Sequence, residues 1–209
     1  MAGHPKVAAK KKIAAKKKTA PTLKAAASQP GPGDVVPIPP KSTFNQGLTS
    51  ASETTMLQLL GVPGAKTKKC GPVTGAFKAR IVTSSVGPFR VTGLDVAVAS
   101  LKAVFDDAKA AIPGVVAAVK SDGMVCVRHK GLNADSFSNH SWGTAIDLFY
   151  RKDAEPQGSP NTDRGNLQLA PFFNKHGWYW GAGFSGKSVD SMHFEMAEET
   201  VRKVLGAHS

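Results

Sequence analysis

The chain has 209 residues, 41% of them hydrophobic, which is enough for one soluble domain with a sizeable core and some additional length. Its net charge of +12 is uneven, because residues 1–42 hold nine lysines and a single acid, Asp34, while the remainder carries only about +4. No apolar run approaches the roughly 18 residues of a membrane span. The two cysteines, Cys70 and Cys126, are too few for a four-cysteine zinc site, and the sequence leaves open whether they form a disulfide.

Residues 1–42 are rich in Ala, Lys and Pro, and they predict a disordered basic tail followed by an extended linker. The folded domain is expected over residues 43–209. The tail is either solvated without a function or attaches the protein to an anionic polymer, such as nucleic acid, lipid headgroups or a cell-wall polymer. Its lysines are not followed by the roughly 7–15 apolar residues of a Sec signal peptide, so no such leader is predicted.

Four segments have the signals of helices, namely apolar residues at helical spacing between polar caps and Gly or Pro stops. They are residues 52–61, 92–112, 166–177 and 198–206. Ser52 and Thr92 can cap the first two helices, and Pro113 ends the second. The third helix contains Pro171, which interrupts or restarts it.

Three segments are expected to be strands, and they are residues 124–128, 145–150 and 191–196. In the second strand, Ile146 and Leu148 lie on the face opposite Asp147, and in the third, His193 and Glu195 share the face opposite the apolar residues. The apolar faces can pack on the helices, so the polar side chains could line a cleft. Because strands and helices mix without βαβ regularity, we expect an α+β fold with a small, mainly antiparallel sheet.

A histidine lies just before the second predicted strand, at His140, across a turn that Gly143 permits. If the two polar-faced strands are neighbours, His140, Asp147 and His193 converge in a cleft on the sheet. Two imidazoles and one carboxylate give zinc three protein ligands and leave a fourth position open, as in catalytic sites. Taken alone, a pair such as His140 and Asp147 more often belongs to a structural turn, in which the aspartate caps and the histidine hydrogen-bonds.

Two sequence motifs resemble those of a family of zinc peptidases, the D-Ala-D-Ala carboxypeptidases and L-alanyl-D-glutamate endopeptidases. The segment "SNHSWGTAID" (138–147) is similar to the family's SxHxxGxAxD motif. The segment "DSMHFE" (190–195) is similar to its second motif, in which an acidic residue precedes a histidine by three positions. The resemblance covers roughly residues 85–197 and implies a Hedgehog/D-Ala-D-Ala peptidase-like fold.

The resemblance also implies roles for residues at the centre of the cleft. His140, Asp147 and His193 would bind one Zn²⁺ per chain. Asp190 takes the position of the catalytic acid/base, which removes a proton from the attacking water and returns one to the leaving amine. Glu195 competes for this role because it shares a strand face with His193; otherwise it is a hydrogen-bonding partner of the zinc ligands.

Further residues are expected around the substrate. Arg128 takes the position of a family arginine that holds the substrate and stabilises the developing oxyanion, although it could also be a surface arginine at a strand end. Ser138 matches the serine of the first motif and is expected to orient the turn or to touch substrate. Trp142 and residues 178–184 ("WYWGAGF") would supply aromatic walls for the cleft, and Trp178 could equally belong to the core.

This resemblance predicts a zinc-dependent metallopeptidase that hydrolyses an amide bond in peptidoglycan stem peptides. The bond is either the terminal D-Ala-D-Ala bond, cut by a carboxypeptidase, or the L-Ala-D-Glu bond, cut by an endopeptidase. Two alternatives stay open: a non-catalytic cell-wall or polyanion-binding protein, and a nucleic-acid-associated protein that acts through the lysine tail. The expected substrate lies in the periplasm or cell wall. The protein could reach it by release in the manner of a phage lysin or by delivery through a secretion system. We expect the protein to be a monomer.

Overall fold

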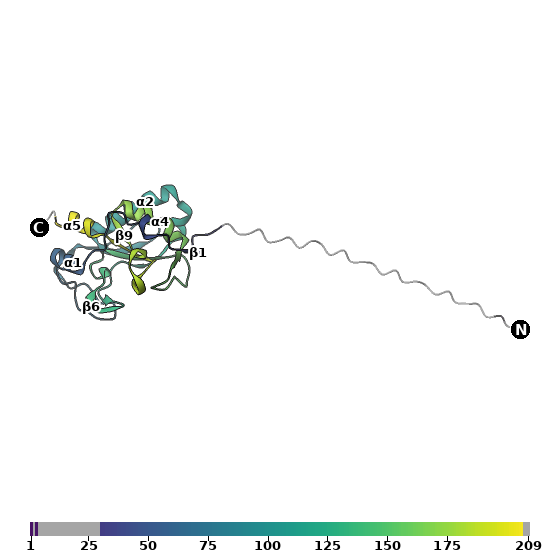
Figure 1. The fold of residues 1–209 in the computed structure, drawn as a ribbon, viewed down its shortest axis with the longest axis horizontal. Helices are drawn as coiled ribbons and strands as arrows, with labels where there is room; N and C mark the ends of the chain where they lie inside the picture. The colour runs from purple at the N-terminus through teal and green to yellow at the C-terminus, as the bar shows by residue number, and fades with distance from the viewer. Residues whose placement is uncertain (2, 4–29, 207–209) are drawn as a thin grey trace.

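The computed structural model describes residues 1, 3 and 30–206, whose fold is shown in Figure 1. At its centre is a four-stranded antiparallel sheet with the strand order β4-β7-β10-β9. The strands are β4 Lys120–Gly123, β7 Ala145–Phe149, β9 Trp178–Trp180 and β10 His193–Met196. Together with the helices, this sheet confirms the predicted α+β class.

Five α-helices pack around the sheet in the described part of the chain. They are α1 Glu53–Leu60, α2 Asp95–Ala111, α3 Pro113–Ala118, α4 Arg164–Lys175 and α5 Glu198–Gly206. Helices α2 and α4 pack together on one side of the molecule, and α1 packs against α5 at another (Figure 1). None of these helices is long and apolar enough to cross a membrane.

Shorter elements connect these parts. Three two-stranded ribbons are β1 Val35–Pro37 with β8 Asn161–Asp163, β2 Ile81–Ser85 with β3 Arg90–Leu94, and β5 His129–Lys130 with β6 Asn133–Phe137. The 3-10 helices are η1 Lys41–Thr43, η2 Ala76–Arg80, η3 Asn139–Trp142, η4 Gly181–Gly183 and η5 Gly186–Ser188.

The N-terminal boundary of the fold differs from the expected one at residue 43. Strand β1 lies in the segment predicted to be a linker, and it pairs residue by residue with β8. Ile38, directly after β1, packs against the core. The Pro-rich segment therefore belongs to the domain, because its backbone pairs with β8 and its apolar residue Ile38 packs against the core. Residues 4–29 of the predicted tail lie outside the described residues.

The predicted helices are present, with shifted ends in two cases. Helix α1 is capped as expected, because the Ser52 hydroxyl accepts the Thr55 N–H at 3.1 Å and the chain leaves the helix at Gly61 with φ +75°. Helix α2 starts after Leu94 and not at Thr92, since β3 uses Thr92 to pair with β2. Helix α4 runs through Pro171 without a break, because its buried apolar face packs into the core and offsets the lost N–H bond.

The prediction of a strand over residues 124–128 is wrong. Within this segment only Val127 forms an isolated bridge, with Gly71, and the preceding residues form β4. Met124 and Val127 are buried, so the apolar pattern was a correct sign of burial. The backbone partners of the segment are Thr92, Gly71 and two residues of the turn that contains His140, described below. The structure also settles the cysteines, because Cys70 and Cys126 form a disulfide.

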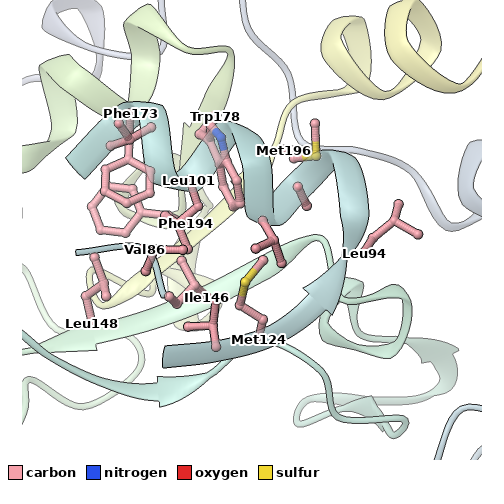
Figure 2. Close-up of a cluster of buried hydrophobic side chains, with 14 of the residues drawn as sticks. Val86, Leu94, Leu101, Met124, Ile146, Leu148, Phe173, Trp178, Phe194 and Met196 are labelled. Carbon is pink, nitrogen blue, oxygen red and sulfur yellow. The ribbon is translucent and has the colours of Figure 1, made fainter. Parts of the chain in front are cut away.

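The two faces of the central sheet have separate uses. Ile146, Leu148 and Phe194 are fully buried on the face covered by the helices. Figure 2 shows them in one cluster with Leu101 from α2 and Phe173 from α4. The intervening residues of β7 and β10 point to the opposite face, as the alternation in the sequence predicted.

We expect Gly143→Ala to lower the free energy of unfolding by more than the cost of a positive φ at a non-glycine residue. Gly143 has φ +68°, and a Cβ atom there would lie 2.7 Å from the Leu94 nitrogen. The left-handed conformation costs a non-glycine residue about 1–2 kcal/mol, and the clash adds to this. Gly186→Ala is the matched control, because Gly186 has φ +57° with open space around it. Equal losses in urea unfolding would contradict the close contact.

Removal of the disulfide by Cys70→Ser with Cys126→Ser should lower the free energy of unfolding by about 2–4 kcal/mol, because the bond closes a loop with a sequence separation of 56. Urea unfolding of the oxidised wild type and the double variant measures the difference. Wild-type protein treated with a reductant should have the same urea unfolding midpoint as the double variant. Identical unfolding midpoints in all three samples would show that the bond does not stabilise the fold.

Candidate metal centre

The register of β7 against β10 brings two polar side chains together. Asp147 on β7 is the direct partner of His193 on β10, and both side chains project from the face opposite the core. His140 comes from the 3-10 helix η3, which ends at Gly143 immediately before β7. The strand pairing and this turn therefore assemble three side chains that are distant in the sequence.

The three side chains direct their polar atoms at one another. Nε2 of His140 lies 3.2 Å from Nδ1 of His193 and 3.2 Å from Oδ2 of Asp147. Oδ1 of Asp147 lies 3.0 Å from the same Nδ1 of His193. Both imidazoles are buried, with side-chain exposures of 5% for His140 and 9% for His193. These atoms thus surround a single point at the base of a cleft.

The outer nitrogens of both imidazoles are held by acceptors. Nδ1–H of His140 donates to the Met124 carbonyl oxygen at 2.8 Å, and Nε2–H of His193 donates to Oε2 of Glu195 at 2.9 Å. A carbonyl and a carboxylate can only accept, so these bonds fix the proton of each ring on its outer nitrogen. When the rings are neutral, the inner nitrogens therefore have the lone pairs, which face Asp147 as metal-binding histidines require.

Backbone hydrogen bonds hold η3 in place. The Cys126 N–H donates to the His140 carbonyl at 2.9 Å, and the Ser138 N–H donates to the Arg128 carbonyl at 3.0 Å. The Ser141 hydroxyl lies 3.0 Å from the Arg128 carbonyl and 3.1 Å from the Arg128 nitrogen. The segment 124–128, tied to Cys70 by the disulfide, is therefore the support of the histidine turn.

The electrostatics of the cluster favour a cation. Burial alone would raise the pKa of Asp147, but the His140 and His193 imidazoles outweigh it and hold that pKa well below its usual range. Burial alone would lower the pKa of His193, but hydrogen bonds to Asp147 and Glu195 hold it well above its usual range. The cluster therefore retains positive charge, in the form of a proton, when nothing else supplies it.

This donor set fits a zinc ion. One ligand atom from each of His140, Asp147 and His193 lies within 4.8 Å of the others. Two nitrogens and one carboxylate oxygen are ligands that zinc takes, and three protein ligands are typical of its catalytic sites. The acceptors behind both imidazoles complete the arrangement that zinc sites use to orient their histidines.

A pocket of about 520 Å³ opens above the cluster, and it contains all but one of the predicted site residues. Those residues are Arg128, Ser138, His140, Asp147, Asp190, His193 and Glu195. The exception is Trp142, which is fully buried, packs edge-on against Phe137 and donates its indole N–H to the Gly61 carbonyl. The expectation that Trp142 lines the cleft is therefore wrong; an aromatic next to a turn was needed to fill the core beneath it.

Other aromatics do form the cleft wall. Tyr179 and Phe184 line the pocket and stack with their ring centroids 5.5 Å apart. The Phe184 ring lies 5.8 Å from that of His193. Trp178 and Trp180, from the same predicted segment, are fully buried in the core. The alternation of strand β9 thus divides "WYW" between the core and the cleft.

The two candidate acids differ in how their carboxylates are occupied. Glu195 accepts from Nε2–H of His193, from the Ser50 hydroxyl at 2.5 Å and from the Asn139 amide at 2.8 Å. No side chain among the described residues hydrogen-bonds to the Asp190 carboxylate within the pocket. Burial raises the pKa of Asp190, although the nearby His193 opposes the rise. Asp190 is therefore the carboxylate with free acceptor capacity.

Sequence reasoning missed two residues of this arrangement, Ser50 and Asn139. Ser50 precedes α1 and reaches the site because it bridges to Ala197 at the end of β10. Asn139 stands next to His140, but its amide points to Glu195 and to the Ala51 carbonyl. A polar residue beside the motif histidine was a visible signal in the second case, whereas nothing local in the sequence pointed to Ser50.

Comparisons with known proteins agree with the motifs. Residues 132–196 match the model of a family described as D-alanyl-D-alanine carboxypeptidase. No curated protein and no solved structure matches the chain significantly. The matched residues include the three clustered side chains, Asp190 and Glu195, whereas Arg128 and Ser50 precede them. The match supports a peptidase activity, and it confirms the predicted resemblance over the segment that contains both motifs.

Proposed function

We propose that this chain is a zinc metallopeptidase that hydrolyses an amide bond in peptidoglycan stem peptides. The observation that best supports it is the convergence of His140, Asp147 and His193 at the base of a pocket, within the segment that matches the carboxypeptidase family. A buried cluster of two imidazoles and a carboxylate, with both imidazoles held from behind, is costly for a protein that does not use it.

His140 through Nε2, His193 through Nδ1 and Asp147 through its carboxylate would hold the zinc ion. When bound, zinc supplies Lewis-acid chemistry, which polarises a carbonyl group and lowers the pKa of water. The chain's own part is to keep the three ligand atoms in place before the metal arrives. Strand pairing does this for Asp147 and His193, and the braced turn does it for His140.

Asp190 would perform the proton transfers of the reaction. It faces the pocket near His193 and Asp147, and its carboxylate is not tied to another side chain among the described residues. Its raised pKa makes it a stronger base than a solvated aspartate, and proton transfer from water is then more favourable. It would take a proton from the attacking water and give one to the departing amine.

The rim of the pocket would bind the substrate. Arg128 and Lys130 both line the pocket, at the start of the β5–β6 ribbon, and they bring positive charge to it. Stem peptides have free carboxylates, which a guanidinium and an ammonium would attract. Tyr179 and Phe184 supply an apolar wall for the alanine side chains. Arg128 would also stabilise negative charge that develops on the scissile carbonyl.

Purified peptidoglycan incubated with zinc-loaded protein tests this function, because mass spectrometry of the products reports both activity and the bond cleaved. A loss of terminal D-Ala indicates a carboxypeptidase, and a new D-Glu amine terminus indicates an L-Ala-D-Glu endopeptidase. Asp147→Asn should abolish product formation and reduce the zinc content, because it removes the charged ligand. Asp107→Asn is the matched control, since Asp107 pairs with His176 at 2.9 Å outside the pocket. Wild-type protein that releases no product, or that contains no stoichiometric zinc, would refute the proposal.

Asp190→Asn should lower kcat about 10²–10⁴-fold, the usual contribution of a general acid/base, and leave the zinc content unchanged. Glu195→Gln should instead weaken zinc binding, because it disturbs the acceptor of the His193 Nε2–H. Steady-state hydrolysis of a stem peptide and metal analysis of both variants separate the two roles. Full activity in Asp190→Asn, or a pure kcat defect in Glu195→Gln, would reverse the assignment.

A further inference from the structure

We propose that Ser50 and Asn139 are positioning residues of the metal centre, which act through Glu195. This inference rests on the proposed zinc function, and it assigns roles to two residues outside the ligand set and the acid/base. Together with Glu195 they form what we call the carboxylate cradle: Ser50, Asn139 and Glu195.

The cradle uses the acceptor capacity of Glu195 almost completely. Oε1 accepts from the Ser50 hydroxyl at 2.5 Å, and Oε2 accepts from the Asn139 amide at 2.8 Å. Oε2 also accepts from Nε2–H of His193 at 2.9 Å. The Glu195 side chain is only 4% exposed, so its orientation is set by these donors and not by water.

The cradle donors also determine which way the Glu195 carboxylate faces. With the Ser50 hydroxyl on Oε1 and the Asn139 amide on Oε2, Glu195 directs Oε2 at Nε2–H of His193. A carboxylate accepts hydrogen bonds, so it favours the proton of the His193 ring on Nε2. Loss of a donor would let the carboxylate rotate away from Nε2–H, and Nδ1 of His193 would no longer be reserved for the metal.

The two donors come from parts of the chain that fix them firmly. Asn139 lies in η3 beside His140, and its amide makes a second bond, to the Ala51 carbonyl at 3.0 Å. Ser50 forms a backbone bridge with Ala197, directly after β10. The cradle therefore links the turn that holds His140 to the strand that holds His193, through the segment that precedes α1.

Ser50→Ala tests the inference with little risk to folding, because Ser50 is only half-buried. Outer hydrogen-bond partners of zinc ligands change metal affinity about 10–100-fold, so we expect the zinc dissociation constant to rise about 10-fold. Competition with a chromophoric chelator measures it. Ser50→Thr keeps the hydroxyl and should bind zinc within about twofold of wild type. Ser159→Ala should also match wild type, since it removes a comparable hydroxyl–carboxylate bond, to Glu155 at 2.6 Å, and neither residue lines the pocket.

A second measurement covers the buried Asn139. The ¹⁵N chemical shifts of the His193 ring report which nitrogen bears the proton. At a pH at which the His193 ring of the metal-free protein is neutral, wild type and Ser159→Ala should show Nε2–H, whereas Asn139→Asp should show a mixture of both tautomers. If Asn139→Asp does not fold, both the zinc dissociation constant and the His193 tautomer are measured in Ser50→Ala, and these two measurements decide.

The outcomes separate this inference from the proposed function. Wild-type protein that binds no zinc overturns both. If wild type binds zinc, and Ser50→Ala has the same zinc dissociation constant and the same His193 tautomer as wild type, the cradle alone is overturned. A Ser50→Ala variant that changes only the KM for a stem peptide would also overturn it, because Ser50 would then contact substrate rather than position His193.

Discussion

The antiparallel pairing of β7 with β10 is the constraint on which the rest of the structure depends. In this register Asp147 lies opposite His193 on one face, while Ile146 lies opposite Phe194 on the other. The hydrophobic core therefore fixes the register that the polar cluster needs, because a slip by one residue would put His193 into the core and Phe194 into the pocket. The stability of the fold and the geometry of the candidate metal centre are set by the same hydrogen-bond ladder.

A second layer of polar contacts adjusts what the sheet places. The sheet brings two side chains to one face, but it does not determine which ring nitrogen points inward. That choice depends on the Met124 carbonyl behind His140 and on Glu195 behind His193. The same distinction separates the two acids of the second motif. Glu195 is occupied by three donors, and Asp190 remains available at the pocket surface.

Much of this arrangement could be predicted from the sequence, because it follows from periodicity. Alternation in residues 145–150 and 191–196 gave the correct faces for Asp147 and His193, and the turn at Gly143 placed His140 beside them. The predictions were wrong where an apolar residue could be buried in more than one kind of structure. Residues 124–128 are buried as an irregular support of a turn, and Trp142 is buried beneath the cleft and not beside it. Ser50 could not be found, since its contact with Glu195 spans 145 positions and leaves no local pattern.

The order of the elements along the chain has a consequence for biosynthesis. The turn with His140 and the strand with Asp147 are made well before β10, which is followed only by α5 among the described elements. A nascent chain that ends before β10 leaves β7 without one of its two neighbouring strands, and it has only two of the three ligands. The candidate metal centre therefore lacks its third ligand until β10 has been made, and it is completed together with the central sheet.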